Sequence, residues 1–241
     1  MENIFTRTEL LIGKQGVETL KNSKVIIFGV GGVGSFVCEA LARAGVGNLI
    51  LVDKDIVDVT NINRQIIALQ STIGKIKVEV MKERILDINP LCNVTSHKVF
   101  LSKENIEELI PKDIDYVVDA IDTVTSKIDL AVWCCEHNIK IISSMGTGKK
   151  LDPTKFKIDN IYNTKVCPLA KVMRKQLKIR GIKKLKVLYS EEIPIQPKLE
   201  ECGLENTEEN RRMPSSISFV PSCAGLIIGG EVIKDIIKNE Y

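Results

Sequence analysis

The sequence lacks the features that mark a zinc-binding, secreted or membrane-spanning protein. Its seven cysteines are scattered, and no two form a Cys-x-x-Cys pair, so we expect no zinc and reduced thiols in the cytoplasm. The first residues contain no basic start followed by an apolar block, and no signal peptide is therefore expected. The longest apolar run near the C-terminus, residues 224–230, is too short to cross a bilayer, so we expect no membrane partner.

Histidine and net charge are also scarce. The only histidines are His97 and His137, and neither is placed to handle a hydride at the edge of the expected sheet. This argues against a dehydrogenase. The net charge of +3 is compatible with a phosphate-bearing partner but does not require one. Hydrophobic residues make up 44% of the chain, which is enough for a large core.

Short apolar runs alternate with helical patterns along the first 150 residues. Strands are predicted over residues 24–28, 48–52, 93–99, 115–119 and 140–143. Helices are predicted over residues 8–20, 33–44, 74–89, 103–109 and 124–137. Such alternation is typical of right-handed crossovers between parallel strands. We therefore predict an α/β fold with a doubly wound, Rossmann-like, mostly parallel sheet.

The pattern changes beyond residue 148. It predicts strands over residues 156–162 and 185–189, and helices over residues 168–180 and 220–238. Residues 190–214 contain three prolines, seven glutamates and little periodicity, which predicts a mobile loop. We expect one domain over residues 1–241, in which residues 1–150 bind a nucleotide and residues 151–241 form a substrate-facing extension.

A glycine-rich turn follows the first predicted strand and opens a helix. Its four glycines would let backbone amides close around phosphate oxygens; they are Gly29, Gly31, Gly32 and Gly34. Asp53 lies 19 residues past Gly34 at the end of the second strand, where a carboxylate can reach ribose hydroxyls. This fingerprint fits a redox dinucleotide as well as ATP.

The segment Thr-Asn-Ile-Asn-Arg-Gln at residues 60–65 favours ATP. It places Arg64 near the phosphates, where a redox cofactor has little need of an arginine. A reaction that splits a triphosphate does need one, to offset the charge that builds on the leaving pyrophosphate. The alternative is a polar loop in which Asn61, Asn63 and Arg64 are simply solvated.

Two further charged groups point to the same ligand. Lys77 falls in the first turn of a predicted helix, where the helix dipole disfavours a cation unless an anion such as a triphosphate compensates. Lys75 is a weaker candidate, and either lysine could instead be solvated. Asp119 and Asp122 follow a strand, and we expect a structural role for Asp119 and a magnesium ligand in Asp122. Either carboxylate could instead cap the helix that begins at residue 124.

Together these motifs resemble the ubiquitin-activating-enzyme-like, ThiF-type adenylyltransferases, which are ATP-dependent. The resemblance covers most of residues 5–150 and includes Asp55. It implies an ATP site, with magnesium, at Gly32, Asp53, residues 60–64 (Thr60 among them), Lys77, Asp122 and Thr123. Arg7 resembles the N-terminal arginine that reaches the partner subunit's nucleotide in dimers of this superfamily, which implies a homodimer.

The C-terminal part resembles one group within that superfamily. It lacks the two Cys-x-x-Cys pairs usual in activators of sulfur-carrier proteins. Residues 143–153, 167–174 and 189–191 instead resemble the tRNA threonylcarbamoyladenosine dehydratases. The resemblance implies ATP-dependent ring closure of a threonylcarbamoyl side chain on a tRNA adenosine beside the anticodon. It also implies a monovalent cation, to which the sequence assigns no position.

Eight lysines and arginines between residues 171 and 186 are consistent with an RNA surface, although a charge run is also typical of a solvated face. Three other functions stay open. The first is activation of the C-terminal Gly-Gly of a ubiquitin-like sulfur-transfer protein. The second is an NAD-dependent dehydrogenase, and the third is a scaffold that binds ATP without turnover. Cys167 and Cys202 could be reactive thiols or passive ones.

Overall fold

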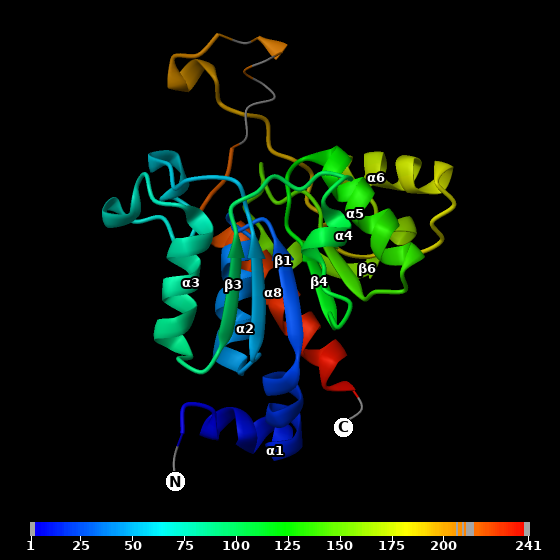
Figure 1. Ribbon diagram of the computed structural model, residues 1–241. Coiled ribbons are helices and arrows are strands. Elements are labelled where there is room, and N and C mark those ends of the chain that lie inside the picture. Colours follow the sequence, from blue (N-terminus) through cyan, green and yellow to red (C-terminus); the bar gives the residue numbers. More distant parts are fainter. Residues whose placement is uncertain (1–2, 206, 209, 211–214, 239–241) are drawn as a thin grey trace.

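The computed structural model describes residues 3–205, 207–208, 210 and 215–238 (Figure 1). Within these residues the chain forms a seven-stranded sheet with the order β3-β2-β1-β4-β5-β7-β6. Neighbouring strands are parallel, except that β6 runs antiparallel to β7. The strands are β1 (Lys24–Phe28), β2 (Asn48–Val52), β3 (Asn93–His97), β4 (Tyr116–Asp119), β5 (Ile141–Ser144), β6 (Phe156–Asn160) and β7 (Lys186–Ser190). The predicted fold class is confirmed.

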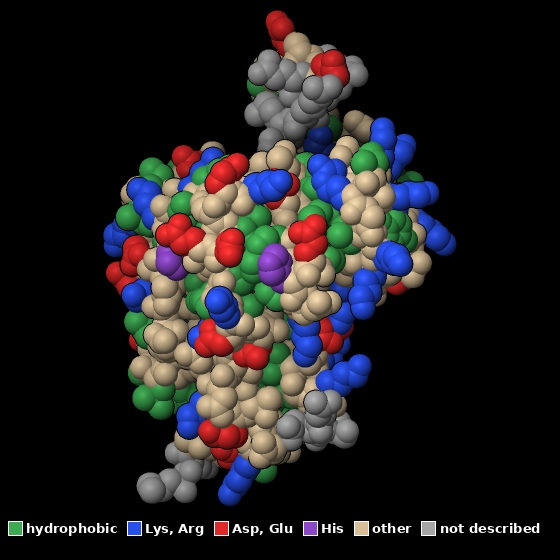
Figure 2. Space-filling model, turned by 45° about the vertical axis from the view of Figure 1, so that its right-hand side comes forward, with side chains coloured by type: hydrophobic (Ala, Val, Ile, Leu, Met, Phe, Trp, Pro, Cys, Tyr) green, Lys and Arg blue, Asp and Glu red, His purple; other side chains and the backbone are tan. Residues whose placement is uncertain are grey.

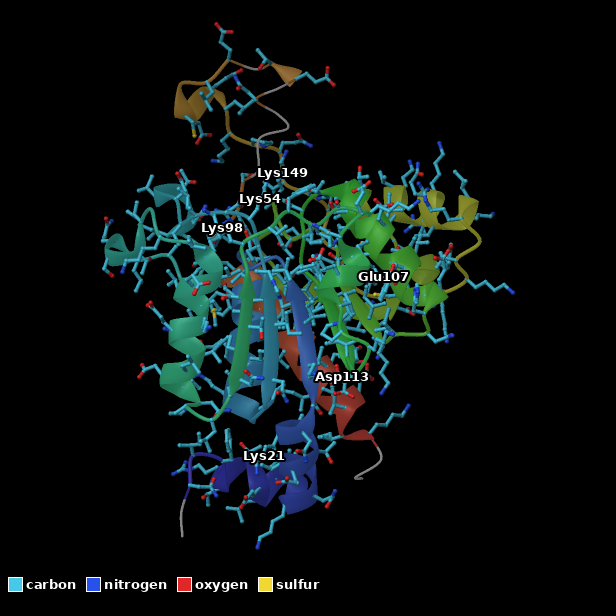
Figure 3. All side chains as sticks on the ribbon, viewed as in Figure 1. Lys21, Lys54, Lys98, Glu107, Asp113 and Lys149 are labelled. Atoms are coloured by element: carbon cyan, nitrogen blue, oxygen red, sulfur yellow. The ribbon has the colours of Figure 1, made fainter. Side chains whose placement is uncertain are left out.

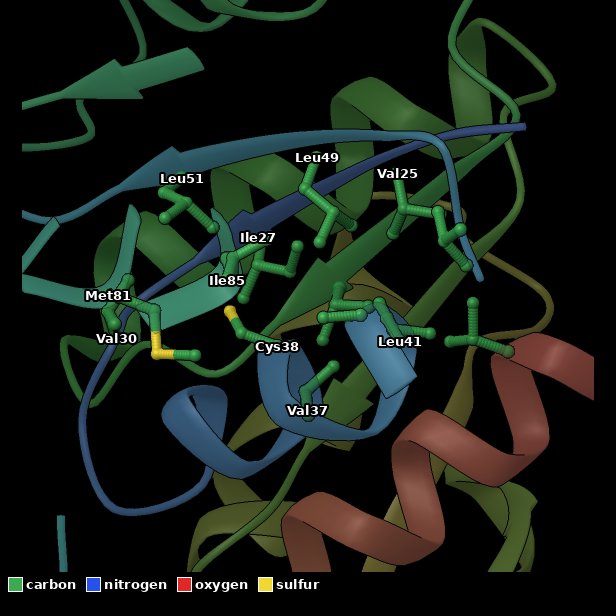
Figure 4. Packing of buried hydrophobic residues seen from close by; sticks show 14 of the residues in the cluster. Val25, Ile27, Val30, Val37, Cys38, Leu41, Leu49, Leu51, Met81 and Ile85 are labelled. Atoms are coloured by element: carbon green, nitrogen blue, oxygen red, sulfur yellow. The ribbon is translucent and has the colours of Figure 1, made fainter. Parts of the chain in front are cut away.

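Helices cover both faces of the sheet because successive strand residues point to opposite sides. The helices are α1 (Thr6–Asn22), α2 (Gly34–Ala44), α3 (Lys77–Ile88), α4 (Ile106–Leu109), α5 (Val124–Glu136), α6 (Pro168–Ile179) and α8 (Phe219–Ile236). Val25 and Ile27 of β1 enter a core shared with α2, α3 and α8, and Figure 4 shows Cys38 of α2 against them. Ile26 and Phe28 enter a second core under α4, α5 and α6.

The strand order reverses between β1 and β4. β2 and β3 lie on one side of β1, whereas β4 and the later strands lie on the other. Loops that leave two such strands diverge and open a crevice at the carboxyl edge of the sheet. In Figure 1 this edge is at the top, and α1 lies at the opposite end. The fold therefore brings the ends of β1, β2, β4 and β5 to one place.

Helix α3 was predicted to begin at residue 74, but in the structure it begins at Lys77. Gly74 has a φ of 82°, and its N–H donates to the carbonyl of Val57. The N–H of Val57 in turn donates to the carbonyl of Lys75. These bonds and the antiparallel bridge between Ile56 and Ile76 hold the segment outside the helix, so Lys77 becomes the first residue of α3.

The other predicted elements agree with the structure to within a few residues. Helix α1 differs most in shape, because Gly13 (φ 74°, ψ 165°) interrupts it with a kink. The helix predicted from residue 103 is the short α4, which begins at Ile106. The strand predicted to residue 162 ends at Asn160, where a 3-10 turn follows. In the part of the chain that the structure describes, no helix combines the length and apolarity needed to cross a membrane.

Residues beyond 150 continue the same sheet and close over α2. A Cβ atom on Gly225 of α8 would lie 2.3 Å from the carbonyl oxygen of Val33, and one on Gly229 would lie 2.6 Å from the Cβ of Ala40. The two helices therefore approach more closely than larger residues would permit. As a result, α8 packs directly on α2, the helix that follows the glycine turn.

The predicted loop is irregular where it is described. Residues 191–199 form no helix or strand, and a short 3-10 turn covers Glu200–Cys202. Figure 1 shows this segment projecting beyond the carboxyl edge of the sheet. Residues 206, 209 and 211–214 of the predicted loop lie outside the described residues. Its mobility stays a prediction.

Candidate functional site

A cleft of about 460 Å³ opens at the carboxyl ends of β1, β2, β4 and β5. The side chains labelled in Figure 3 at this end of the molecule include Lys54, Lys98 and Lys149. Most of the predicted site residues line the cleft: Gly29, Gly31, Gly32, Asp53, Asp55, Asn61, Arg64, Lys77, Asp122 and Thr123. Segments far apart in the sequence therefore meet in one crevice.

The glycine turn forms one wall of this cleft. Gly29 has a φ of 88°, and a Cβ atom there would lie 2.6 Å from the carbonyl oxygen of Ala120. A Cβ on Gly34 would lie 1.8 Å from the carbonyl oxygen of Gly29, so Gly34 serves close packing behind the turn and does not line the cleft. Its predicted contact with the cofactor stays a prediction. The start of α2 faces the cleft, as expected for binding a phosphate.

Asp53 ties the end of β2 to the glycine turn. Its Oδ2 accepts the N–H of Val30 at 2.7 Å, and its Oδ1 accepts the N–H of Asp55 at 2.8 Å. The carboxylate lines the cleft and is partly buried. Each carboxylate oxygen has a second lone pair. Asp53 can therefore accept a ribose hydroxyl while it holds the turn.

A short 3-10 turn over Val59–Asn61 shapes the next segment. Asp58 caps it by accepting the N–H and the hydroxyl of Thr60 at 2.8 Å and 2.6 Å, and these bonds lower the pKa of the Asp58 carboxyl. The Asn61 side chain is buried and accepts the N–H of Asp58 at 3.1 Å. Thr60 bonds to Asp58 and is not among the residues that line the cleft, and its contact with the nucleotide stays a prediction.

Arg64 lies over the glycine turn. Its Nη1 donates to the carbonyl of Thr60 at 3.0 Å and to Oδ1 of Asn63 at 2.9 Å. Asn63 in turn donates to the carbonyl of Ser216 at 3.1 Å and does not itself line the cleft. No described carboxylate forms an ion pair with Arg64. The guanidinium is thus held in place with its charge available to an anion.

Lys77 already has an anionic neighbour. Its side chain is only 7% exposed, and its Nζ lies 3.1 Å from Oδ2 of Asp55, which is 50% exposed. The prediction named a triphosphate as the compensating anion at this helix start. In the structure Asp55 supplies that charge, and Lys77 is still among the residues that line the cleft. Lys75 is exposed and does not line it.

Asp122 offers an open carboxylate on the β4 side of the cleft. It is exposed, and its Oδ1 accepts the Thr123 hydroxyl at 3.3 Å. Neither Asp119 nor Asp122 caps α5, because the residue before that helix is Thr123 and no side chain caps it. Among the described residues, no three His, Cys, Asp or Glu side chains form a group that could hold a metal by themselves. A magnesium ion held by one carboxylate and by phosphate oxygens fits this donor set.

Arg7 lies outside the cleft altogether. It is an exposed residue of α1, which occupies the end of the molecule opposite the cleft (Figure 1). It does not reach the cleft of its own chain. Any contact between Arg7 and a nucleotide therefore requires a second copy of the chain.

Sequence reasoning assigned no role to several cleft residues. Gln65 is 6% exposed, and its Oε1 has no hydrogen-bond partner; the Oγ of Ser216 is likewise buried and unpaired. Phe100, from the loop after β3, lines the cleft with the ammonium of Lys54 5.0 Å from its ring centroid. Only folding reveals them, because Ser216 and Phe100 come from segments without a motif. Gln65 is the last residue of the motif at residues 60–65, but the sequence does not show that its side chain is buried.

All seven cysteines are free thiols. Cys202 is exposed in the irregular segment, whereas Cys167 is buried at the start of α6, beside the loop that lines the cleft. Burial raises the pKa of Cys38 and of Cys134, and it raises the pKa of Cys92 to about 11. These three thiols are therefore protonated and unreactive at neutral pH.

Comparison with known proteins identifies the family. The ThiF family model matches residues 5–240. The tRNA threonylcarbamoyladenosine dehydratase of Bacillus subtilis is 51% identical over 241 residues, which is 98% of this chain and 95% of the relative. The Escherichia coli enzyme of that name, TcdA, solved with AMP, superposes with a TM-score of 0.88 at 32% identity, covering 97% of this chain and 93% of that one. Its complex with ATP gives 0.87 at 31% identity, covering 98% and 94%. The chain belongs to the ThiF family.

Proposed function

We propose that the protein is an ATP-dependent tRNA threonylcarbamoyladenosine dehydratase. The observation that carries the proposal is a single cleft in which a glycine turn, Asp53, Arg64, Lys77 and Asp122 converge. That set suits a nucleoside triphosphate whose polyphosphate is being split. Identity of 51% over nearly the whole of a relative with this activity in its name supports the choice of acyl substrate.

The first step activates a carboxylate. Its oxygen attacks the α-phosphorus of ATP, the bond from that phosphorus to the bridging oxygen breaks, and pyrophosphate leaves. Arg64 and Lys77 lie where they can neutralise the charge that builds on the leaving group. The product is an acyl adenylate, whose leaving group is AMP rather than oxide.

The second step closes a ring. A nitrogen or oxygen of the same side chain attacks the activated carbonyl, loses its proton and expels AMP. The carboxylate oxygen thus leaves with AMP, and the nucleoside has lost the elements of water. No protein thiol takes part, which agrees with burial of Cys167 and with the position of Cys202 outside the residues that line the cleft.

Magnesium would be held by Asp122 and by the phosphates, and it would supply charge neutralisation at the transferring phosphorus. We also propose a monovalent cation near the active centre, by family resemblance alone. The free thiols are consistent with a cytoplasmic enzyme.

Helix α6 offers a basic face for RNA. Lys171, Lys175 and Lys178 are exposed and, at this spacing, share one side of the helix, opposite the buried Ala170, Met173 and Leu177. In Figure 2 lysine and arginine side chains gather toward the upper right, where α6 lies. Helix α6 begins beside the cleft, because Leu169 lines it. We propose that phosphates of tRNA contact this face, with affinity that falls as salt rises.

We further propose a homodimer in which Arg7 of each chain reaches the nucleotide of the other. Arg7 lies at the end of the molecule opposite its own cleft, which is consistent with such an exchange. An exposed apolar strip on α1, which includes Leu10 and Leu11, would be covered by the dimer.

The test is mass spectrometry of tRNA nucleosides after incubation with protein and ATP. We expect a product that has lost water from threonylcarbamoyladenosine, together with AMP and pyrophosphate. Arg64→Ala and Asp122→Ala should abolish the product and leave the fold intact by circular dichroism. Arg43→Ala, a surface arginine on α2, is the matched control. Pyrophosphate release stimulated by a ubiquitin-like carrier ending in Gly-Gly, and not by modified tRNA, would replace this proposal with the sulfur-transfer alternative.

A further inference from the structure

A buried charged pair lies beneath the cleft floor. Lys127 of α5 and Asp119 at the end of β4 both have side chains with 0% exposure, and Lys127 Nζ lies 2.9 Å from Asp119 Oδ1. Removing two charges from water is costly, and apolar side chains of similar size often give equal or greater stability. Stability alone therefore gives no reason for these two residues to be charged.

Both partners bond to the backbone of one residue, Ile121, and so hold the two peptide units that flank its Cα. Lys127 Nζ donates to the carbonyl of Ile121 at 3.1 Å, and the N–H of Ile121 donates to Asp119 Oδ1 at 3.2 Å. Asp119 Oδ2 also accepts the hydroxyl of Ser143 on β5. The pair thus fixes the residue immediately before Asp122 through both of its backbone groups. This agrees with the structural role predicted for Asp119.

The turn at residues 120–121 also packs against the glycine turn. The carbonyl oxygen of Ala120 would lie 2.6 Å from a Cβ on Gly29, and the Cβ of Ala120 would lie 3.3 Å from one on Gly34. Residues 120–121 therefore pack against the phosphate-binding wall on one side and lead into Asp122 on the other. A displacement of the Ile121 peptide would move the open carboxylate relative to that wall.

We propose that Lys127 is a positioning residue: through Asp119 and the Ile121 peptide, it sets the place at which the Asp122 carboxylate meets the magnesium–nucleotide complex. Lys127 does not line the cleft and acts only through the backbone. The inference rests on the proposed function, because its ligand is magnesium-bound ATP. This role would explain why Lys127 is charged, which stability alone does not explain.

The decisive variant is Asp119→Asn/Lys127→Met. It removes both charges with little change of shape, and the asparagine can still accept the Ile121 N–H and bond to Ser143. Only the support of the Ile121 carbonyl is lost. Binding of an ATP analogue with a methylene bridge between its α and β phosphates is followed by calorimetry, in EDTA and over a magnesium chloride titration. We expect the magnesium concentration at half-saturation to rise by about 10–100-fold, as for other groups that orient a metal ligand. Binding in EDTA should stay near that of the wild type.

The control is Lys186→Met, which breaks a partly buried ion pair at the opposite end of the sheet. It should lower the melting temperature without changing magnesium half-saturation. Lys127→Arg keeps a donor beside Ile121 and should restore wild-type magnesium dependence even if it is less stable, so it carries the test if the double variant does not fold. The inference is overturned if the double variant keeps the wild-type magnesium concentration at half-saturation. It is also overturned if Lys127→Arg raises that concentration as the double variant is expected to do. A wild-type protein that binds no ATP analogue overturns the proposed function instead.

Discussion

Replacing three glycines by alanine separates the energetic roles that glycine plays in this fold. Gly230 lies inside α8 with open space around its Cβ position. Gly74 also has open space but a φ of 82°, and Gly29 combines a φ of 88° with a backbone oxygen 2.6 Å from its Cβ position. The three positions therefore isolate helix propensity, backbone conformation, and conformation plus steric clash.

The magnitudes follow from these environments. Gly230→Ala should stabilise the protein by about 1 kcal/mol, the usual difference between the two residues within a helix. Gly74→Ala should cost about 1–2 kcal/mol for a left-handed alanine. Gly29→Ala should cost about 2–5 kcal/mol, because overpacking adds about 1–3 kcal/mol to the same conformational penalty.

Urea denaturation followed by circular dichroism measures the series, and nucleotide binding is measured on the same samples. Each 1 kcal/mol corresponds to about 2–4 °C in melting temperature for a chain of this size. Only Gly29→Ala should also weaken nucleotide binding, because only that residue lines the cleft. Equal stability of the Gly29 and Gly74 variants would refute the clash, and a destabilised Gly230 variant would refute the packing described around α8.

Three other perturbations test separate parts of the molecule. Gln65→Met removes the unpaired buried Oε1 and should raise the free energy of unfolding by about 1 kcal/mol; a loss of stability would show that this oxygen has a partner. Burial acts to raise the pKa of Asp235, but hydrogen bonds from Lys186 and Tyr116 outweigh it and lower that pKa. Its contribution to stability is therefore present above the unfolded-state pKa of about 4 and is lost as the pH falls through the folded-state value. Lys186→Met should flatten the acid limb of the stability profile, and an unchanged limb would contradict this. For the dimer, mixing inactive Arg7→Ala and Arg64→Ala proteins should restore about a quarter of wild-type activity, since half of the dimers are mixed and each has one intact site. No recovery after verified subunit exchange would exclude the shared site.

The sequence predicted the strands and the main cleft residues well. β1 and β2 were bounded correctly because they are continuous apolar runs that lead into polar turns. The motif spacing also identified Asp53, Arg64, Lys77 and Asp122, since consecutive strands of a doubly wound sheet deliver their ends to one edge.

The rest depended on contacts between distant segments. Nothing local shows that Lys127 is fully buried, because its burial depends on Asp119 and on Ser143 of a neighbouring strand. The start of α3 was misplaced because residues 74–77 pair with residues 55–57. The fingerprint alone also could not show that Gly34 packs against the carbonyl of Gly29, because a glycine there can contact a phosphate or permit close packing.

The position of α8 has a consequence for how the enzyme matures. The Cβ of Pro221 lies 3.2 Å from the Cβ position of Gly32, so the wall over the phosphate turn is supplied by a segment that follows the turn by almost 190 residues. A nascent chain from which α8 has not yet emerged can assemble the early strands but not this wall. Nucleotide should therefore stabilise such a partial chain less than a chain that includes α8, because part of the binding wall is missing.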